Sequence, residues 1–330
     1  MRYVRPITGA EGPGALRLAG GPCRFEAVEI LVRGRAPAIA PVGELTEAER
    51  HALTAPRPPV AGIPMDRARL MGILNATPDS FSDGGAFVAR DAAVAHALAM
   101  VADGADIIDI GGESTRPGAA LVPDAQEASR VVPVIAALRA DSDVAISVDT
   151  RKAAVARDAL GAGAGLVNDV SAMTWDAGMA QVVADGGAPV CLMHAQGDPA
   201  TMQANPRYDD VLLDVYDDLA ARIAVAEAAG IPRDRIVVDP GIGFGKTQGH
   251  NLALLRRLSL FHALGCPVLL GASRKRFIGT ITQTEVATHR VAGSLAVTLA
   301  GIAQGMQIHR VHDTKDTKEA CAMMQALQEG

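Results

Sequence analysis

The sequence predicts one (β/α)8 TIM barrel over residues 65–330, preceded by an N-terminal extension over residues 1–64. From residue 68 onward, eight short apolar runs alternate with eight helical patterns. Apolar strands joined by crossover helices indicate a parallel sheet covered by helices, and eight such units are typical of a closed barrel. A doubly wound open sheet is the alternative. It is disfavoured because the first strand–helix turn lacks the sequence G-x-G-x-x-G.

The predicted elements follow one another in a regular order. The strands cover residues 70–74, 107–110, 145–148, 166–167, 190–193, 236–238, 268–270 and 307–311. The helices that follow them cover residues 91–103, 123–140, 152–162, 178–186, 209–229, 250–264, 287–304 and 315–328. The extension is rich in glycine and proline. Its alternating stretch 25–30 predicts a strand, as one arm of a β-hairpin.

Composition excludes several classes of protein. The chain is 49% hydrophobic and 21% charged, which is typical of a globular protein with a sizeable core. A net charge of -6 argues against a general nucleic-acid binder. The four cysteines form no C-x-x-C pair, so we expect buried thiols in a reducing compartment. With no signal peptide or membrane-spanning stretch, the sequence predicts a cytoplasmic protein without membrane partners.

The stretch 235–247, RIVVDPGIGFGKT, allows two interpretations. A phosphate-binding loop needs G-x-x-x-x-G-K-[ST], and the ending GFGKT fits that pattern. The first glycine of the motif would fall at Pro240, which has no N–H to offer a phosphate. We therefore expect a strand that delivers Asp239 to a pocket, followed by glycines that shape a turn.

Polar residues follow the predicted strands at the end where such barrels place their active sites. Asp149, Asn168 and Asp239 come directly after apolar residues, where an unpaired polar group would be costly. Two carboxylates and an amide can accept N–H groups of a polar heterocycle. Lys275, Arg310 and His312 can face an anion. His194 follows the fifth strand, either as a structural histidine or as a ligand contact.

A metal centre made of protein ligands is not predicted. There is no H-E-x-x-H motif and no cluster of histidines and cysteines with ligand spacing. A Mg²⁺ ion held mostly by substrate phosphate oxygens and water remains compatible with the sequence, and Asn75 would suit its single protein ligand. The loops 76–85 and 113–122 are expected over the barrel mouth, as surface loops or as a lid.

Nine segments together resemble a known family. They are MGILNATPDSFSDGG (71–85), IIDIGGESTRPGA (107–119), SVDT (147–150), VND (167–169), LMHAQG (192–197), DPGIGFGK (239–246), GASRKRFIG (271–279), AGSLAV (292–297) and RVHD (310–313). In this order, across roughly residues 68–330, the chain resembles the dihydropteroate synthases. That family has a (β/α)8 barrel, in agreement with the strand count. The resemblance implies condensation of 6-hydroxymethyl-7,8-dihydropterin diphosphate with p-aminobenzoate, with Mg²⁺ as cofactor, and a homodimer.

The resemblance also implies roles for individual residues. The residues expected to contact the pterin diphosphate are Thr115, Arg116, Asp149, Asn168, Asp239, Lys275, Arg310, Val311 and His312. The residues expected around p-aminobenzoate are Thr115, Pro117, Phe244, Ser273 and Lys275. Catalysis is expected to depend on Asp149, Lys275, Arg310 and His312, and Asn75 is expected to bind the metal.

Two other functions stay open from the sequence. A pterin-dependent methyltransferase would share the barrel and the Asp/Asn/Asp set, and a paralogue could bind pterin without catalysis. The chain departs from the family pattern at Ala195, where a methionine is common, and at Arg276, where a small residue is common. The N-terminal extension is also longer than the usual short hairpin.

Overall fold

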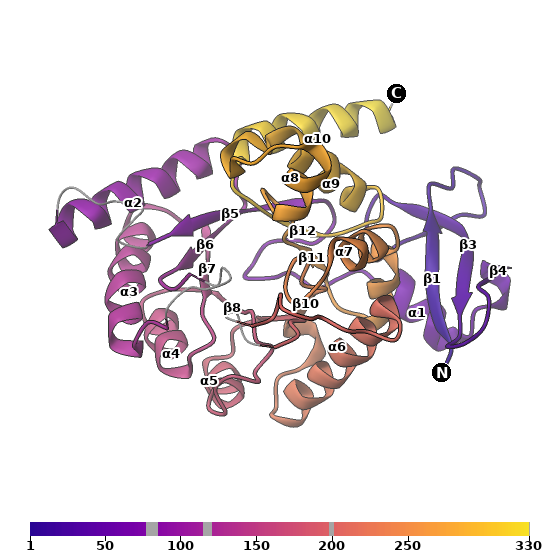
Figure 1. Cartoon of the computed structure of the whole chain (residues 1–330), viewed down its shortest axis with the longest axis horizontal. Helices are drawn as coiled ribbons and strands as arrows, with labels where there is room; N and C mark the ends of the chain where they lie inside the picture. Colours follow the sequence, from indigo (N-terminus) through magenta and orange to yellow (C-terminus); the bar gives the residue numbers. More distant parts are fainter. Residues whose placement is uncertain (77–84, 115–120, 198–200, 330) are drawn as a thin grey trace.

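Eight parallel strands form one curved sheet in the order β10-β9-β8-β7-β6-β5-β12-β11 (Figure 1). The computed structural model describes residues 1–76, 85–114, 121–197 and 201–329. The strands are β5 (Arg69–Asn75), β6 (Ile107–Gly111), β7 (Ala145–Asp149), β8 (Leu166–Asp169), β9 (Val190–Met193), β10 (Ile236–Asp239), β11 (Leu269–Leu270) and β12 (Ile308–Val311). A parallel bridge between Val238 and Val268 joins β10 to the segment before β11. The sheet is thus a nearly closed barrel, and the predicted fold class is confirmed.

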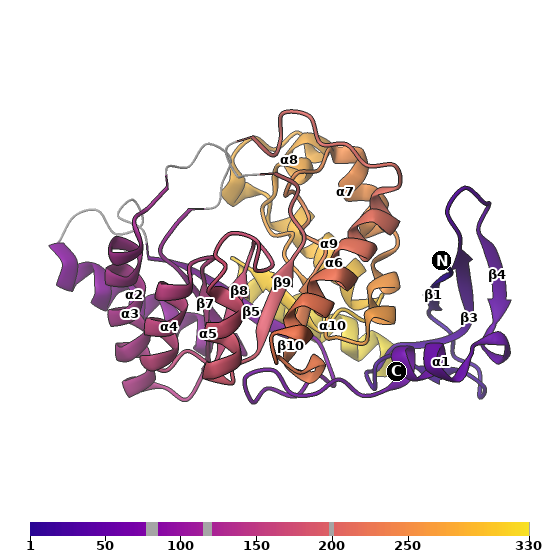
Figure 2. The same ribbon diagram turned by 90° about the horizontal axis from the view of Figure 1, so that it is seen from below.

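Helices surround the strands on the outside of this barrel (Figures 1 and 2). They are α2 (Gly85–Ala102), α3 (Asp124–Asp141), α4 (Ala153–Gly161), α5 (Met179–Gly186), α6 (Val211–Ala228), α7 (Gln248–Leu255), α8 (Arg276–Thr282), α9 (Val291–Ile302) and α10 (Thr314–Glu329). Local sequence explains some of their ends: Asp210 caps α6 by accepting from the N–H groups of Leu212 and Leu213. None of the helices that the structure describes is long and apolar enough to cross a membrane.

Side chains alternate between the two faces of each strand. On β6, Ile108 and Ile110 belong to the large core shared with the helices, whereas Ile107 belongs to a second, smaller cluster. That cluster gathers one residue from every barrel strand: Met71, Ile107, Ala145, Leu166, Cys191, Val237, Leu269 and Ile308. Because strand side chains have a period of two, the next inward position along each strand lies above this apolar layer.

The N-terminal residues form a separate antiparallel sheet beside the barrel (Figure 2). Its elements are β1 (Tyr3–Thr8), β2 (Leu16–Arg17), β3 (Arg24–Leu31) and β4 (Ala38–Pro41), followed by α1 (Glu47–Thr54). Strand β3 pairs antiparallel with β4, the next strand in the chain, so the predicted hairpin is present. Phe25, Val28 and Leu53 give this sheet its own small core. The domain boundary between residues 64 and 65 stays a prediction.

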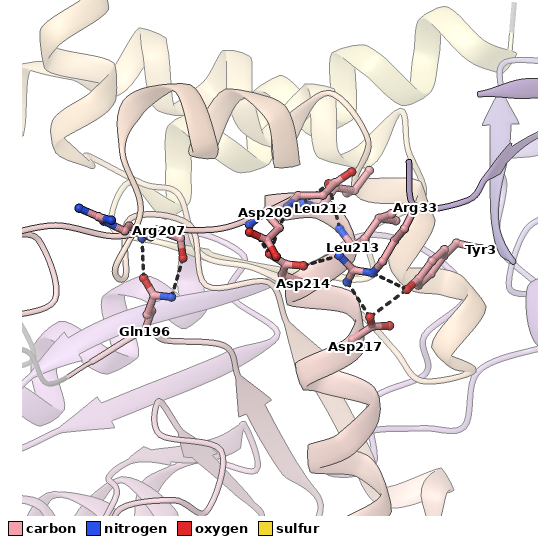
Figure 3. Close-up of polar contacts among 10 residues, drawn as sticks. Tyr3, Arg33, Gln196, Arg207, Asp209, Leu212, Leu213, Asp214 and Asp217 are labelled. Carbon is pink, nitrogen blue, oxygen red and sulfur yellow. Dashed lines mark hydrogen bonds and ion pairs between the residues drawn. The ribbon is translucent and has the colours of Figure 1, made fainter. Parts of the chain in front are cut away.

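Polar contacts attach the extension to helix α6 (Figure 3). Arg33 donates to Asp214 at 2.6 Å and to Asp217 at 2.7 Å. The hydroxyl of Tyr3 also donates to Asp217, at 2.8 Å, and its ring meets Tyr216 edge-on. The other oxygen of Asp214 accepts from the backbone N–H of Asp209, just before the helix. The extension therefore contacts the start of α6.

One predicted helix differs in the structure. The pattern at 250–264 predicts a single helix, but α7 ends at Leu255 and a 3₁₀ segment, η4 (Leu258–Leu264), follows. The physical reason is tertiary: Leu258, Leu260 and Phe261 are buried, and Ser259 donates to the carbonyl of Pro6 on β1 at 2.8 Å. Helices α1 and α8 are additions that the sequence did not predict.

Candidate active site

One row of paired residues crosses the carboxyl ends of four strands. Asn75 on β5 is the register partner of Gly111 on β6, and Gly111 is the partner of Asp149 on β7. Asp149 in turn pairs with Asn168 on β8. On the far side of the barrel, Asp239 ends β10. Strand register therefore places the predicted polar residues at one end of the barrel, above the apolar layer.

Arg310 on β12 is joined to β6 and β7 by ion pairs. Its Nε donates to Oδ2 of Asp109 on β6 at 2.6 Å, and its Nη2 donates to Oδ2 of Asp149 at 2.7 Å. The side-chain amide of Asn168 donates to the same oxygen of Asp109, at 3.1 Å. Burial raises the pKa of Asp149, and the positive charge of Arg310 opposes that shift.

Asp109 is a site residue that the sequence analysis missed. It lies within the apolar run 107–110, and only the residues after that run were considered. A signal was available: a lone carboxylate inside an apolar strand must find a partner, because an unpaired buried charge is costly. Asp109 is fully buried.

Asp239 ends β10 against a tight turn. Its Oδ1 accepts from the backbone N–H of Gly241 at 2.7 Å. Burial raises the pKa of Asp239 to about 6, against the opposing effects of that hydrogen bond and of Lys275. Gly241 has φ +66°, and a Cβ there would lie 1.8 Å from the carbonyl oxygen of His194. Only glycine fits this position, so the glycines after Asp239 shape the turn, as predicted.

Lys246 holds that same turn in place from inside the protein. Its ammonium donates to the carbonyls of Gly241 at 2.9 Å and Phe244 at 3.0 Å, and lies 2.8 Å from Nδ1 of His194. Burial lowers the pKa of Lys246 to about 7 and that of His194 to about 3. Neutral His194 can therefore accept from the lysine. These contacts give His194 a structural role. The ammonium of Lys246 is directed at protein carbonyls, so it does not have the geometry of a phosphate-loop lysine.

Lys275 lies in the turn after β11. Its ammonium donates to the carbonyl of Ile242 at 2.6 Å and lies 4.0 Å from the centre of the Phe244 ring. Burial lowers the pKa of Lys275 to about 8, while the charge of Asp239 opposes the shift. The predicted residues Lys275, Phe244 and Asp239 thus lie on one side of the barrel mouth.

The same turn brings Ser273 next to His312. Oγ of Ser273 lies 3.0 Å from Nδ1 of His312 and accepts from its backbone N–H at 3.3 Å. Between Ser273 and Lys275 stands Arg274, whose φ of 57° is unusual for a residue other than glycine. Ion pairing with Asp313 stabilises this strained turn. Val311, also predicted, is buried on β12 between Arg310 and His312.

Thr115, Arg116 and Pro117 lie outside the described residues. The segments on either side of them are described and are tied together. Glu113 accepts from the backbone N–H of Val122 at 2.9 Å. Lys152, directly after β7, pairs with Glu113 at 3.3 Å and with Glu127 at 2.5 Å. All three of these charged residues are buried, so the ends of this loop are anchored beside Asp149.

A metal-ligand cluster of histidine, cysteine and acidic residues does not occur within the described part of the chain. Asn75 is an exposed carboxamide at the end of β5, in the same register row as Asp149. One neutral oxygen ligand suits a Mg²⁺ ion that is held mainly by phosphate oxygens and water. The residues present therefore fit such an ion only when it arrives with an anionic substrate.

The two residues that depart from the family pattern lie in different surroundings. Ala195 is half-buried, and Arg276 is exposed at the start of α8.

Known proteins are similar to this chain in both sequence and architecture. The family described as pterin binding enzyme matches residues 71–312. The dihydropteroate synthase of Escherichia coli (strain K12) is 46% identical over 262 residues, which are 79% of this chain and 92% of that protein. A Xanthomonas albilineans dihydropteroate synthase solved with 4-aminobenzoic acid is 48% identical at a TM-score of 0.78, covering 84% of this chain and all of that one.

A second structure of the Xanthomonas albilineans enzyme holds 7,8-dihydropteroate. It is 45% identical at a TM-score of 0.76 and covers 83% of this chain and 100% of its own. The family match begins at residue 71, so it leaves out the N-terminal sheet. Within the barrel the agreement in sequence and in architecture is extensive. The chain therefore belongs to the dihydropteroate synthase family of pterin-binding enzymes.

Proposed function

We propose that this protein condenses 6-hydroxymethyl-7,8-dihydropterin diphosphate with p-aminobenzoate, releasing diphosphate and forming 7,8-dihydropteroate. The observation that carries the proposal is the set of polar side chains at the carboxyl ends of the strands. Asp149, Asn168 and Asp239 offer acceptors at one end of the barrel, with Arg310 and Lys275 beside them. Acceptors for a heterocycle next to cations for an anion match a pterin that carries a diphosphate.

Asp239 and Asn168 would hold the pterin edge. That edge carries adjacent N–H donors, and one carboxylate can accept two of them. Oδ1 of Asp239 already accepts from Gly241, which leaves Oδ2 for the ligand. A buried charge is tolerable when a ligand pairs it. Lys275, within the electrostatic reach of Asp239, would border the ring on the same side.

The diphosphate would lie toward Arg310, Val311 and His312, with Thr115 and Arg116 from the neighbouring loop. When bound, Mg²⁺ supplies positive charge to the diphosphate, with Asn75 as its protein ligand. His312 would donate from its ring to the anion, and Ser273 Oγ, at 3.0 Å from Nδ1, fixes that ring. Binding here would position the bond that breaks near Asp149.

The p-aminobenzoate would enter beside Phe244, Ser273 and Lys275, with Thr115 and Pro117. Its amine is a neutral nucleophile at pH 7, so a strong general base is not needed. The amine lone pair attacks the methylene carbon, the C–O bond breaks toward diphosphate, and the amine proton passes to solvent. As diphosphate leaves, positive charge spreads into the pterin ring, where the Asp149 carboxylate stabilises it. Catalysis then rests on positioning and electrostatics.

One assay tests the proposal. The protein is supplied with the pterin diphosphate, p-aminobenzoate and Mg²⁺, and both diphosphate release and dihydropteroate formation are measured. We expect equal amounts of the two products. Pterin binding without product would instead identify a non-catalytic paralogue. Transfer of a methyl group from a folate to a corrinoid protein, in place of condensation, would identify a pterin-dependent methyltransferase.

We also propose that the protein is a homodimer that uses helix α9. The buried residues of this apolar helix are Ser294, Thr298 and Gly301, while Leu295 and Leu299 stay partly exposed. Apolar side chains on the open side of a helix favour a partner surface. Sedimentation should give a dimer, and Leu299→Glu should shift it toward a monomer. A wild-type monomer at micromolar concentration would contradict the proposal.

The expected location is the cytoplasm, where thiols stay reduced. All four cysteines are free, and Cys191 and Cys266 are buried. Fractionation of the native organism with an antibody would test this location.

A further inference from the structure

Asp109 is a buried carboxylate that has no role in the proposed reaction so far. It sits in the middle of β6, where its register partners are Ile73 on β5 and Ser147 on β7. Its exposed fraction is 0%. An ionised carboxylate in such a place persists only when it is paired and hydrogen-bonded. What it pairs with are residues proposed to contact the substrate.

A single oxygen of Asp109 takes both donors. Oδ2 accepts from Nε of Arg310 at 2.6 Å and from the amide of Asn168 at 3.1 Å. Oδ1 is buried and has no hydrogen-bond partner among the described residues. The influence of Asp109 on the pocket therefore passes through Oδ2, to Asn168 and to Arg310.

The contact with Asn168 decides which end of its amide faces the pocket. A carboxamide carries a donor end and an acceptor end, and hydrogen bonding selects between the two orientations. With the NH2 group held by Asp109, the carbonyl oxygen of Asn168 is the end left for a ligand. An acceptor is what the N–H groups of a pterin require.

The contact with Arg310 fixes the base of its guanidinium. Nε is bound to Asp109, and Nη2 reaches Asp149 at 2.7 Å. A guanidinium is a rigid planar fork, so holding Nε restrains the direction of the other two nitrogens. Asp109 therefore keeps Arg310 beside Asp149, the carboxylate proposed to act during bond breaking.

We propose that Asp109 is a positioning residue of the pterin site, which orients the Asn168 amide and the Arg310 guanidinium without touching substrate. This inference rests on the proposed function and deepens it. Asp109 sets the polarity that the pocket shows to the pterin ring, so its loss alters recognition of the pterin substrate. Recognition of p-aminobenzoate on the Lys275 side stays as it is.

The test compares Asp109→Asn with Ser147→Ala in the full-length protein. Asparagine keeps the size of the side chain and removes its charge. Ser147 is the register partner of Asp109 on β7, is equally buried, and its Oγ has no hydrogen-bond partner among the described residues. We expect Asp109→Asn to raise KM for the pterin diphosphate tenfold or more, with KM for p-aminobenzoate within twofold of wild type. Ser147→Ala should leave both constants unchanged.

A purely structural role predicts a different pattern. A variant that is only less well folded loses active molecules, so kcat falls while both KM values stay the same, and that result would overturn the inference. Thermal unfolding of each variant gives the folded fraction. If wild type itself makes no dihydropteroate, the proposed function fails first. Wild-type activity with normal constants in Asp109→Asn refutes the positioning role alone.

A double-mutant cycle provides the second measurement. Asp109→Asn and Asn168→Ala are combined, and binding of 6-hydroxymethylpterin is titrated for all four proteins. If Asp109 acts through Asn168, the two losses in affinity are less than additive. Fully additive losses would contradict the proposed route through Asn168.

Discussion

Arg33 and Arg310 each bridge two aspartates, in contrasting surroundings. Arg33 joins the N-terminal sheet to Asp214 and Asp217 on α6, at 2.6 and 2.7 Å (Figure 3). Arg310 joins Asp109 and Asp149 inside the barrel, also at 2.6 and 2.7 Å. The side chains of Asp214 and Asp217 are 26% and 37% exposed, whereas those of Asp109 and Asp149 are 0% and 9% exposed. Equal distances therefore accompany very different access to water.

The difference shows that access to water, and not distance, decides how much such an ion pair contributes to stability. Water already solvates the charges around Arg33, so the exposed contact contributes little. In the barrel, both carboxylates lose their hydration, and the positive charge of Arg310 offsets that loss. The exposed bridge attaches one sheet to another part of the fold. The buried bridge holds charged side chains together at the candidate active site.

The largest effect is expected for Arg310→Met. This change leaves Asp109 and Asp149 buried without their cation, and breaking a buried pair in this way costs about 3–5 kcal/mol. Urea unfolding at pH 8 measures the loss in the free energy of unfolding. At pH 5 the loss should be smaller, because Asp149, whose pKa is already raised by burial, can take up a proton. A loss below about 1 kcal/mol at pH 8 would make the two arginines equivalent, contrary to the comparison.

Asp239→Asn tests the ligand-binding side of the buried pocket. The variant keeps the shape but loses the charge that accepts pterin N–H groups. We expect pterin binding to weaken by about 1.5–3 kcal/mol, the scale of a hydrogen bond to a charged group. Titration calorimetry with 6-hydroxymethylpterin measures it. Wild-type affinity in the variant would show that Asp239 does not hold the pterin.

The same carboxyl group should give stability a pH dependence. Folding raises the pKa of Asp239 from 3.8 to about 6, so the folded protein holds this proton more tightly than the unfolded chain. Its contribution is fully present below pH 3.8 and is lost as pH rises through about 6. Unfolding free energies from pH 4 to 7.5 should therefore fall more for wild type than for Asp239→Asn, by on the order of 2 kcal/mol. Identical pH slopes would argue against the raised pKa.

The smallest effect is expected for Arg33→Met. Removing this exposed bridge should lower the free energy of unfolding by about 0–1 kcal/mol, and the difference should shrink further in 1 M salt. Dihydropteroate formation should stay at the wild-type rate, because no proposed substrate contact is lost. Steady-state kinetics and urea unfolding measure the two quantities. A loss comparable to that of Arg310→Met would show that exposure does not separate the two bridges.

Much of the barrel could be predicted because its signals are local. A strand such as Ile236–Asp239 is an apolar run that ends in a carboxylate, and the glycines that follow it predict a turn. Pro240 argues against a phosphate loop on its own, because it has no N–H to offer a phosphate. The polar residues at the strand ends could also be predicted. Each follows an apolar run in the sequence, and parallel strands bring their carboxyl ends together.

The contacts of Asp109 could not be predicted from local signals in the sequence. Its partners, Asn168 and Arg310, lie 59 and 201 residues away in the chain. Only the order and register of the strands from β8 to β12 in the curved sheet bring them together. The break between α7 and η4 has the same origin, since it follows from burial under a strand more than 200 residues earlier.

The sequence alone determined the eight strand–helix units, the end of the barrel at which the candidate site residues lie, and the family to which residues 71–312 belong. Periodicity, turn chemistry and motif order are properties of neighbouring residues, so they can be read directly. The tertiary structure decided which carboxylates share Arg310, which group holds the turn after Asp239, and where the N-terminal sheet docks. These are pairings between distant parts of the chain, and their strength depends on how much water the finished fold excludes.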